Sequence, residues 1–331
     1  MKSKKFKIEK LVVLIAPALI VVLLGTFGCS NDSENAVDTS VGTIVKVNSD
    51  NFIAAGLAEP ISIVSKTLSN GTTADCYKIV SKGTPADHAM GPWCPTNISD
   101  DSSAGGIWLK DGKVYDVDGA FIKNLATFFS DPTWMMYKSS TGEVIRTKTQ
   151  SECQAAANPS VGAEYKNFCV ECLPSYIANL TQTYYIPVSP VKLTNSISFG
   201  MGPQSSGPSV RGIAFNGVRF DAPAPVNIIL AAYTLAPFDD AGGHINLGAG
   251  YHYHAANGKS KEIAQTDGHA PMIGYAIDGH GLFARLDTKG VESSDLDECR
   301  GHTDAVRGYH YHVDTAGANN FINCIKGAYV N

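Results

Sequence analysis

The chain lacks a hydrophobic run long enough to span a membrane, and it has little charge and no excess of positive charge. Its longest apolar run, from Leu11 to Leu24, is about 14 residues, whereas a spanning helix needs about 20. Charged residues make up 17% of the 331 residues. Residues 1–28 hold five lysines and one glutamate, which leaves 21 basic and 30 acidic residues, a net charge of −9. Because nucleic-acid binding requires basic surface, we expect no nucleic-acid partner.

Several signatures of enzymes and of modular chains are also missing. The sequence has no Gly-x-Ser-x-Gly elbow, no phosphate-binding loop and no His-Glu-x-x-His. It shows no long helical period and no clear linker after residue 50. Short apolar runs separated by glycine and proline instead predict a mainly β fold, a β-rich α+β domain with a few short helices.

The N-terminus predicts export. Five lysines precede the apolar run, and a polar stretch follows Cys29, which is the pattern of a secretory signal peptide over residues 1–28. A cysteine directly after Gly28 resembles the lipobox of bacterial lipoproteins, although Thr26 stands where that pattern prefers leucine. We therefore expect lipidation of Cys29, a flexible tether over 29–50, and anchoring to a membrane, with the outer membrane favoured, facing the periplasm or cell surface.

Seven further cysteines predict a disulfide-containing extracytoplasmic domain. The simplest local pairs are Cys76 with Cys94 and Cys299 with Cys324, each closing a loop of about 20 residues. Cys153, Cys169 and Cys172 then leave one thiol over, and the Cys169-Val-Glu-Cys172 spacing is open to a redox or metal pair as well as to a disulfide. We expect an N-terminal cysteine-containing subdomain over 51–180 and a second region over 181–331.

Local patterns place several elements. Asp111-Gly112 and Asn216-Gly217 predict hairpin turns, and the apolar spacing over 121–129 predicts a short amphipathic helix. Short helices are also expected near 151–158 and 172–180. Residues 272–277 read as a buried strand. His88 lies in a loop rich in proline and glycine, where a histidine is solvated or hydrogen-bonded unless the loop delivers it to a site.

One stretch occurs twice. Residues 243–254 and 301–312 both fit Gly-His-x5-Gly-Tyr-His-Tyr-His without a gap. Eight of the nine histidines fall between 244 and 312. They are His244, His252, His254, His269, His280, His302, His310 and His312.

Strand alternation sorts each copy into two faces. His252 and His254 share one face of a strand, as do His310 and His312, while the tyrosines share the other. Imidazoles at i and i+2 can bind one metal ion, and the upstream Gly-His can add another. We predict that the two pairs converge on one coordination sphere or on two adjacent ones, and that the metal hypothesis fails if the two strands lie far apart.

Other residues near the repeats are candidates of lower rank. His269 is a candidate ligand, whereas His280, flanked by glycines, is typical of a solvated loop. The acidic residues before each copy could orient imidazoles, ligate metal, or cap turns. They are Asp239, Asp240, Asp297 and Glu298. Imidazole-rich ligation suits copper, zinc, nickel or iron, and outside the cell copper is favoured, with zinc second.

The chain resembles the YHYH domain family of exported bacterial proteins, many of them lipoproteins. Both Tyr-His-Tyr-His motifs carry the resemblance, together with residues 212–218, 236–240, 243–244, 267–278 and 296–302. It covers 181–331 strongly and the loop 87–95 more weakly. Two positions depart from the family pattern: His280 stands in a Gly-His-Gly where Gly-Phe-Pro is common, and Arg300 replaces an asparagine. The resemblance implies no particular activity.

Three functions are therefore open. The first is a metal-binding protein in metal handling. The second is a metal-dependent enzyme, a zinc hydrolase or a copper redox enzyme, with Glu298, Asp240 or His269 as acid or base. The third is a surface protein whose strands are stapled by metal. The implied partners are a metal ion and, through the lipid anchor, a membrane.

Overall fold

The computed structural model describes residues 42–157, 161–200 and 207–331. The predicted signal peptide and Cys29 lie outside these ranges. In the described part, strands dominate and helices are short, so the predicted fold class is confirmed. None of the described helices is long and apolar enough to cross a membrane.

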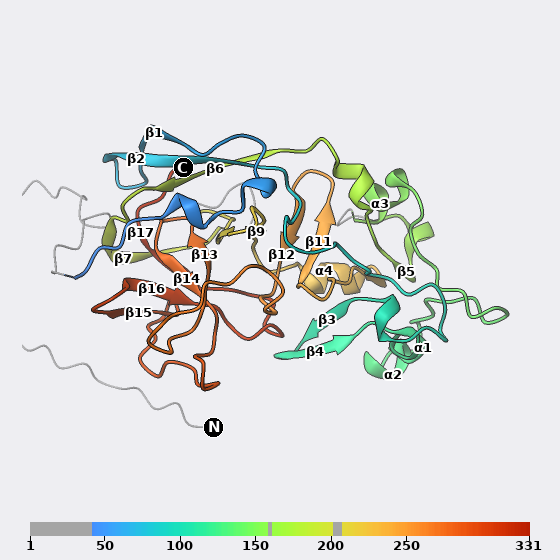
Figure 1. The fold of residues 1–331 in the computed structure, drawn as a ribbon. Helices are drawn as coiled ribbons and strands as arrows, with labels where there is room; N and C mark the ends of the chain where they lie inside the picture. The colour runs from blue at the N-terminus through green and yellow to red at the C-terminus, as the bar shows by residue number, and fades with distance from the viewer. Residues whose placement is uncertain (1–41, 158–160, 201–206) are drawn as a thin grey trace, which may run out of the picture. The chain divides into compact units, whose positions relative to one another are not determined.

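An eight-stranded sheet is built from the part of the chain that holds the two repeats (Figure 1). Its strand order is β11-β12-β9-β8-β13-β14-β16-β15. The strands are β8 (Gly212–Ala214), β9 (Arg219–Phe220), β11 (Gly243–Asn246), β12 (Gly250–Tyr253), β13 (Met272–Ala276), β14 (Gly281–Phe283), β15 (Gly301–Asp304) and β16 (Gly308–His312).

The sheet contains the same four-strand unit twice. The two units extend from the centre of the sheet toward opposite edges. In each unit the first two strands form an antiparallel hairpin, the last two form another, and a parallel pair joins them. The two units meet where β8 pairs antiparallel with β13. The repeat seen in the sequence is therefore the outer hairpin of a larger structural duplication.

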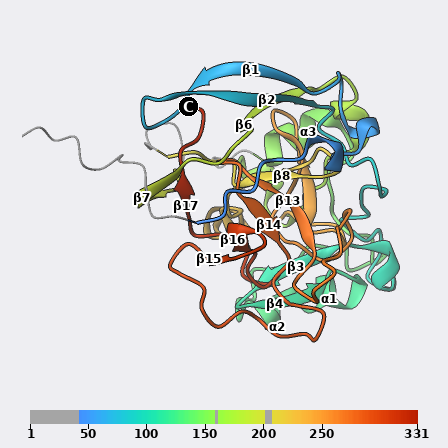
Figure 2. The same ribbon diagram turned by 60° about the vertical axis from the view of Figure 1, so that its left-hand side comes forward.

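Smaller sheets flank the large one on two sides (Figures 1 and 2). On one side lie β1 (Ser62–Thr67), β2 (Thr73–Ser81) and β6 (Gln182–Pro187), and next to them β7 (Lys192–Ser198) with β17 (Cys324–Gly327). On the other lie β3 (Ile107–Lys110) and β4 (Lys113–Asp116), while β5 (Phe168–Cys169) pairs parallel with β10 (Thr234–Leu235).

All helices within the described ranges are short. They are α1 (Gly119–Lys123), α2 (Leu125–Phe128), α3 (Gln150–Ala156) and α4 (Val226–Ala231), with 3-10 turns at Ser49–Asn51, Ala54–Gly56, Ser102–Ala104, Ala163–Tyr165 and Pro174–Ile177. The helix predicted over 121–129 exists as two pieces, because Asn124 caps both α1 and α2. The predicted turns at 111–112 and 216–217 are confirmed by the β3–β4 and β8–β9 pairs.

Three disulfides join cysteines of the described part of the chain. They join Cys94 with Cys169, Cys153 with Cys172, and Cys299 with Cys324. The predicted bond between Cys76 and Cys94 is wrong, since Cys76 is a buried free thiol in β2. Local spacing misled because β5 brings a cysteine from 75 positions away against Cys94. Three disulfides are typical of proteins that fold in an oxidising compartment outside the cytoplasm.

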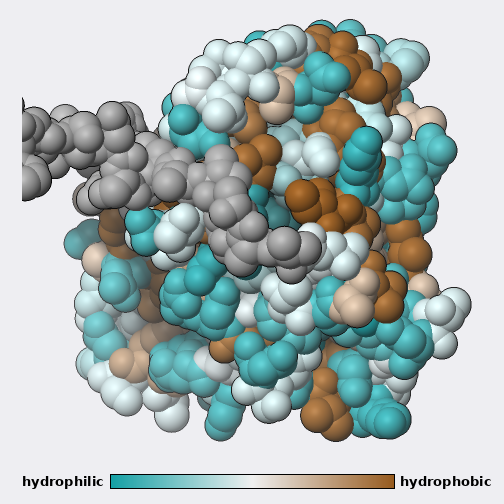
Figure 3. Space-filling model, turned by 90° about the vertical axis from the view of Figure 1, so that its left-hand side faces the viewer, coloured by the Kyte–Doolittle hydropathy of each residue, from teal (hydrophilic) through white to brown (hydrophobic). Residues whose placement is uncertain are grey.

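The hydrophobic core lies largely against the tyrosine side of the duplicated sheet. Tyr251, Tyr253 and Tyr311 are 0–1% exposed and belong to the same apolar cluster as Ile325. A second cluster surrounds Trp108 and covers the region of β3, β4, α1 and α2. On the face toward β7 and β17, hydrophobic residues reach the surface in small groups among hydrophilic ones (Figure 3). The histidines are thus carried by strands whose reverse face is anchored in the core.

Candidate metal centres

Each repeat folds into one β-hairpin, and that hairpin places three imidazoles together. In the first copy β11 pairs with β12 so that His244 lies directly opposite His252. In the second, β15 pairs with β16 so that His302 lies opposite His310. Residues directly opposite in an antiparallel pair share a face, and so do residues at i and i+2. The motif spacing alone therefore brings three histidines of each copy to one face.

Among the described residues the histidines form two separate clusters, one near each edge of the sheet. In each, one nitrogen from every histidine lies within 4.8 Å of the others. The three-histidine centre holds His244, His252 and His254, and the four-histidine centre holds His269, His302, His310 and His312.

The predicted convergence of both Tyr-His-Tyr-His strands on one site is wrong. Four strands, β9, β8, β13 and β14, separate β12 from β16. At about 4.8 Å between neighbouring strands, the two lie roughly 24 Å apart along the sheet. The metal hypothesis for one shared site therefore fails by the criterion stated above, and its error was to treat each strand as half a site. A metal site within each hairpin is a different hypothesis, and it rests on the geometry of each cluster alone. Because the upstream Gly-His folds back onto its own copy, each hairpin assembles a cluster without the other.

The four-histidine centre has its nitrogens arranged for an ion. The Nε2 atom of His302 lies 2.9 Å from that of His310 and 3.2 Å from that of His312. His269, from the loop before β13, places its Nε2 3.1 Å from that of His310. Four nitrogens on a tetrahedron with metal bonds of 2.0–2.1 Å would lie about 3.3 Å apart. The observed spacing is close to that of a ligand set.

Each outer nitrogen of this centre is held by an oxygen. The Nδ1 atoms of His269, His310 and His312 lie 2.9–3.0 Å from backbone carbonyls, which can only accept, so the hydrogen sits on Nδ1. The Nδ1 of His302 lies 2.8 Å from a carboxylate oxygen of Asp295. This arrangement leaves the Nε2 lone pairs pointing inward, as in metal sites whose outer partners orient the imidazoles.

Burial favours the neutral form of His269, His310 and His312. Removal from water, opposed by the backbone carbonyl contact of each ring, lowers the pKa of His310 to about 3 and that of His312 to about 4. The pKa of His269 is also lowered, mainly by burial. A metal ion binds the neutral form, so the lone pairs are available at neutral pH.

The three-histidine centre is built from the same hairpin with different surroundings. Its ring centroids lie 4.8–4.9 Å apart. The Nδ1 of His252 contacts the carbonyl of Gly250 at 3.0 Å, as His310 contacts Gly308 in the other copy. His254 is 4% exposed, and neither of its ring nitrogens meets a partner at good hydrogen-bond geometry, although contact with the backbone of Ala222 partly opposes the effect of burial on its pKa. A buried imidazole without a partner is costly, and a metal ion would supply one.

Burial lowers the pKa of all three imidazoles in this centre, and for His244 and His254 the value falls well below the usual one. The carboxylate of Asp221 lies 3.8 Å from Nε2 of His252 and is paired with Arg219. Neither Asp221 nor Asp295 was singled out in the sequence. The tertiary fold alone brings them to the histidines, so motif spacing carries no signal for them.

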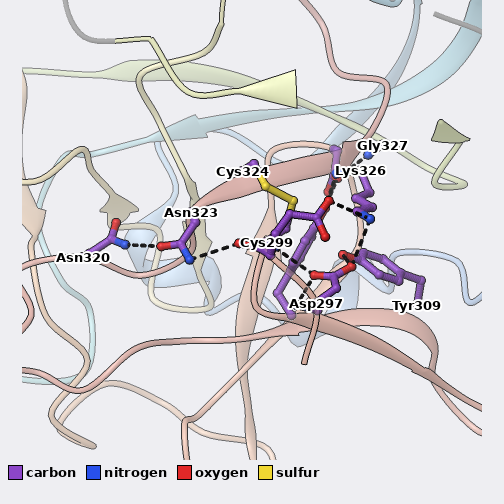
Figure 4. Close-up of a disulfide and its surroundings, with 12 residues drawn as sticks. Asp297, Cys299, Tyr309, Asn320, Asn323, Cys324, Lys326 and Gly327 are labelled. Atoms are coloured by element: carbon purple, nitrogen blue, oxygen red, sulfur yellow. Dashed lines mark hydrogen bonds and ion pairs between the residues drawn. A yellow bond between two sulfur atoms is a disulfide. The ribbon is translucent and has the colours of Figure 1, made fainter. Parts of the chain in front are cut away.

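The reverse face of each hairpin is a hydrogen-bonded tyrosine cluster. Tyr251 donates to Asp239, and Tyr309 donates to Asp297 at 2.9 Å (Figure 4). Tyr311 donates to Asp278 at 2.7 Å, and its counterpart Tyr253 contacts Asn216 at 2.7 Å. Asp239 and Asp297, two of the acidic residues considered as partners of the imidazoles, thus serve the tyrosines instead.

The two remaining histidines also occupy matching places on this reverse face. His88 places Nε2 2.7 Å from the hydroxyl of Tyr253, and the ring of His280 packs on Tyr309 and Tyr311. His280 is also 3.1 Å from Asp278. The expectation that His280 is solvated is wrong, because it is 6% exposed.

The acid–base candidates Glu298 and Asp240 lie elsewhere. Glu298 is largely exposed and pairs with Lys326 at 2.9 Å, and Asp240 is on the surface. Glu298 also lies near Cys299 and Cys324. These cysteines form a disulfide, so their bonded sulfurs are not free to ligate (Figure 4).

Comparison with known protein families supports the resemblance seen in the sequence. Residues 183–295 match the YHYH protein family. The match contains the first hairpin and His269, and it ends before the second hairpin begins. No curated protein and no solved structure matches the chain.

Proposed function

We propose that this protein binds two transition-metal ions per chain outside the cytoplasm, one at each hairpin, and that it acts in metal handling. The observation that carries the proposal is the four-histidine centre, where four Nε2 atoms face one another while every Nδ1 is fixed by an oxygen. Without an ion, clustered buried imidazoles would lose their water contacts and gain little in return.

Copper is the favoured ion and zinc the second. Imidazole donors suit both, and among divalent ions affinity for such donors is highest for copper. Four imidazoles with no thiolate or thioether do not select for Cu(I), so the divalent form is proposed. Attachment to a membrane through Cys29 is part of the proposal, and replacing Cys29 with serine should release the exported protein from the membrane fraction.

The three-histidine centre supports a second candidate, a metal-dependent enzyme. Catalytic zinc commonly has three protein ligands and one open position, which this centre offers. In the four-histidine centre, His269 comes from a loop outside the hairpin, so an ion there would also staple two segments together, the structural alternative. Because the two centres differ, the two roles can coexist in one chain.

Elemental analysis of the folded, exported protein tests the proposal. Native protein should carry two ions per chain. Replacing His252 and His254 with alanine should remove one, replacing His310 and His312 should remove the other, and the combined variant should bind none. His88→Ala, outside both centres, is the control and should keep two. Native protein with less than about 0.2 ion per chain under metal-replete conditions would overturn the proposal.

A further inference from the structure

The three-histidine centre opens into a cavity, and its walls are mostly apolar. The cavity has a volume of about 410 Å³, within the range of small-molecule sites. Its lining includes all three imidazoles. The other walls come from segments far apart in sequence, among them Trp93, Val170, Pro225, Ile228, Ile229 and Pro237.

Helix α4 forms one wall of the cavity and leaves apolar side chains exposed. It buries none of its residues fully, and Ile228 is 48% exposed. An apolar side chain at the edge of a cavity is what a ligand with an apolar body would contact. The helix lies directly after Asp221-Ala-Pro-Ala-Pro225, so the chain that leaves β9 beside the centre also builds this wall.

The number of imidazole ligands also favours binding of a further ligand at this centre. In the other half a fourth imidazole, His269, completes the set, whereas here three imidazoles leave one position of a tetrahedral ion open toward the cavity. His254 is buried, lines the cavity, and has no partner at good hydrogen-bond geometry for either ring nitrogen, so it marks the side of the cavity at which an ion would sit.

Charge selects the class of ligand. Three neutral imidazoles around a divalent ion leave two positive charges in an apolar cavity, and an anionic oxygen would offset one of them. Two carboxylates line the cavity, and each is already paired with an arginine: Asp221 with Arg219, and Glu171 with Arg146. We propose that this centre binds a small organic monoanion, a carboxylate with an apolar or aromatic body, by its oxygen. This rests on the proposed function, since the metal must bind first.

Cobalt-loaded protein and benzoate provide the test. Co(II) absorbs in the visible range according to its ligands, so benzoate should change the spectrum in a saturable way. The change should persist in His310→Ala and be absent in His254→Ala. Benzyl alcohol, which is similar in size but neutral, should bind at least about tenfold more weakly.

A variant of the wall separates this proposal from simple metal binding. Ala232→Phe at the end of α4 should fill part of the cavity, keep the cobalt, and weaken benzoate binding about tenfold or more. Cobalt content is measured on the same samples. Cobalt bound at this centre with no response to benzoate, or an equal response in Ala232→Phe, would overturn the ligand proposal alone. Absence of cobalt from this centre would overturn both proposals.

Discussion

The two halves of the large sheet share a backbone down to individual turns. Gly217 and Gly279 follow the first strand of each half with φ of +91° and +87°, and Gly250 and Gly308 begin the histidine strands with φ of +76° and +62°. These left-handed conformations suit glycine, which has no Cβ. At the third matching position, before each Gly-His, Gly242 has φ +86° and Arg300 has φ +68°.

The halves differ in what surrounds that common hairpin. The first presents three imidazoles to an apolar cavity, and the second adds His269 and fixes His302 through Asp295. The tyrosine side differs as well, with Asn216 in one half and Asp278 in the other. The hairpin thus supplies the imidazoles, and neighbouring loops decide how many ligands an ion receives and what can reach it.

Ligand number should produce the largest difference between the halves. A full structural ligand set contributes roughly 10–16 kcal/mol, so losing one of three imidazoles in His254→Ala should abolish binding at that centre. His310→Ala leaves three imidazoles, and its centre should retain the ion more weakly. Competition with a chelator measures both. Equal losses of metal affinity at the two centres would contradict this difference in ligand number.

The disulfide Cys299–Cys324 exists in the second half only, because Ala241 stands at the matching position of the first. Replacing both cysteines with serine should lower the free energy of unfolding by about 2–5 kcal/mol. Ala241→Ser is the matched control and should cost much less. Denaturant unfolding of metal-free protein gives both values, and a loss in the cysteine variant no greater than in the control would refute the expectation.

Asp295 should tune the four-histidine centre only. Asp295→Asn weakens the contact to His302 and should lower metal affinity there by about 10–100-fold, the usual effect of removing a partner that orients a ligand. The three-histidine centre should be unaffected. Asp240→Asn is the control, because it makes the same change from carboxylate to amide at a surface position. A change at the three-histidine centre would show that the two centres are coupled.

Asp278 should make the second half sensitive to acid. Burial opposes its ionisation, but the charge of His280 and hydrogen bonds from His280 and Tyr311 outweigh burial and lower the pKa of Asp278 below its ordinary 3.8. Since the unfolded chain binds that proton more readily, the stabilisation is present above about pH 4 and is lost as the pH falls.

Asp278→Asn should therefore lower the free energy of unfolding by about 1–2 kcal/mol near neutral pH. It should also reduce the loss of stability at acid pH, which is called the acid limb. Asn216→Ala, in the other half, should also destabilise the protein but leave the acid limb unchanged. Unfolding measured between pH 3 and 7 distinguishes them. An unchanged acid limb in Asp278→Asn would rule out this carboxylate as its source.

Arg300 should give the smallest effect. Its left-handed backbone is unfavourable for a residue with a Cβ, but the side chain donates to the carbonyls of His312 and Val313 and pairs with Glu292. Arg300→Gly relieves the unfavourable backbone conformation but loses the side-chain contacts, and the two effects should nearly cancel. The free energy of unfolding, measured by thermal unfolding, should therefore change by no more than about 1 kcal/mol. Gly242→Arg lacks these partners and should destabilise by more.

Much of the local structure could be predicted from the sequence. Asp111-Gly112 and Asn216-Gly217 are turn signals that depend on nearest neighbours, and both hairpins formed. The separation of histidines from tyrosines also follows from strand alternation. The partner of Cys94 could not be predicted, since β5 and β10 bring Cys169 to it from a distant segment.

The sequence by itself determined the contents of each hairpin: the positions of His244, His252 and His254 in Gly-His-x5-Gly-Tyr-His-Tyr-His set three imidazoles on one face. Only the tertiary structure decided that the two copies form separate centres, because strand order is set by pairing between segments distant in sequence. It also decided that His269 joins one centre while an apolar cavity adjoins the other. Short-range geometry fixes ligand type, and long-range packing fixes ligand number and access.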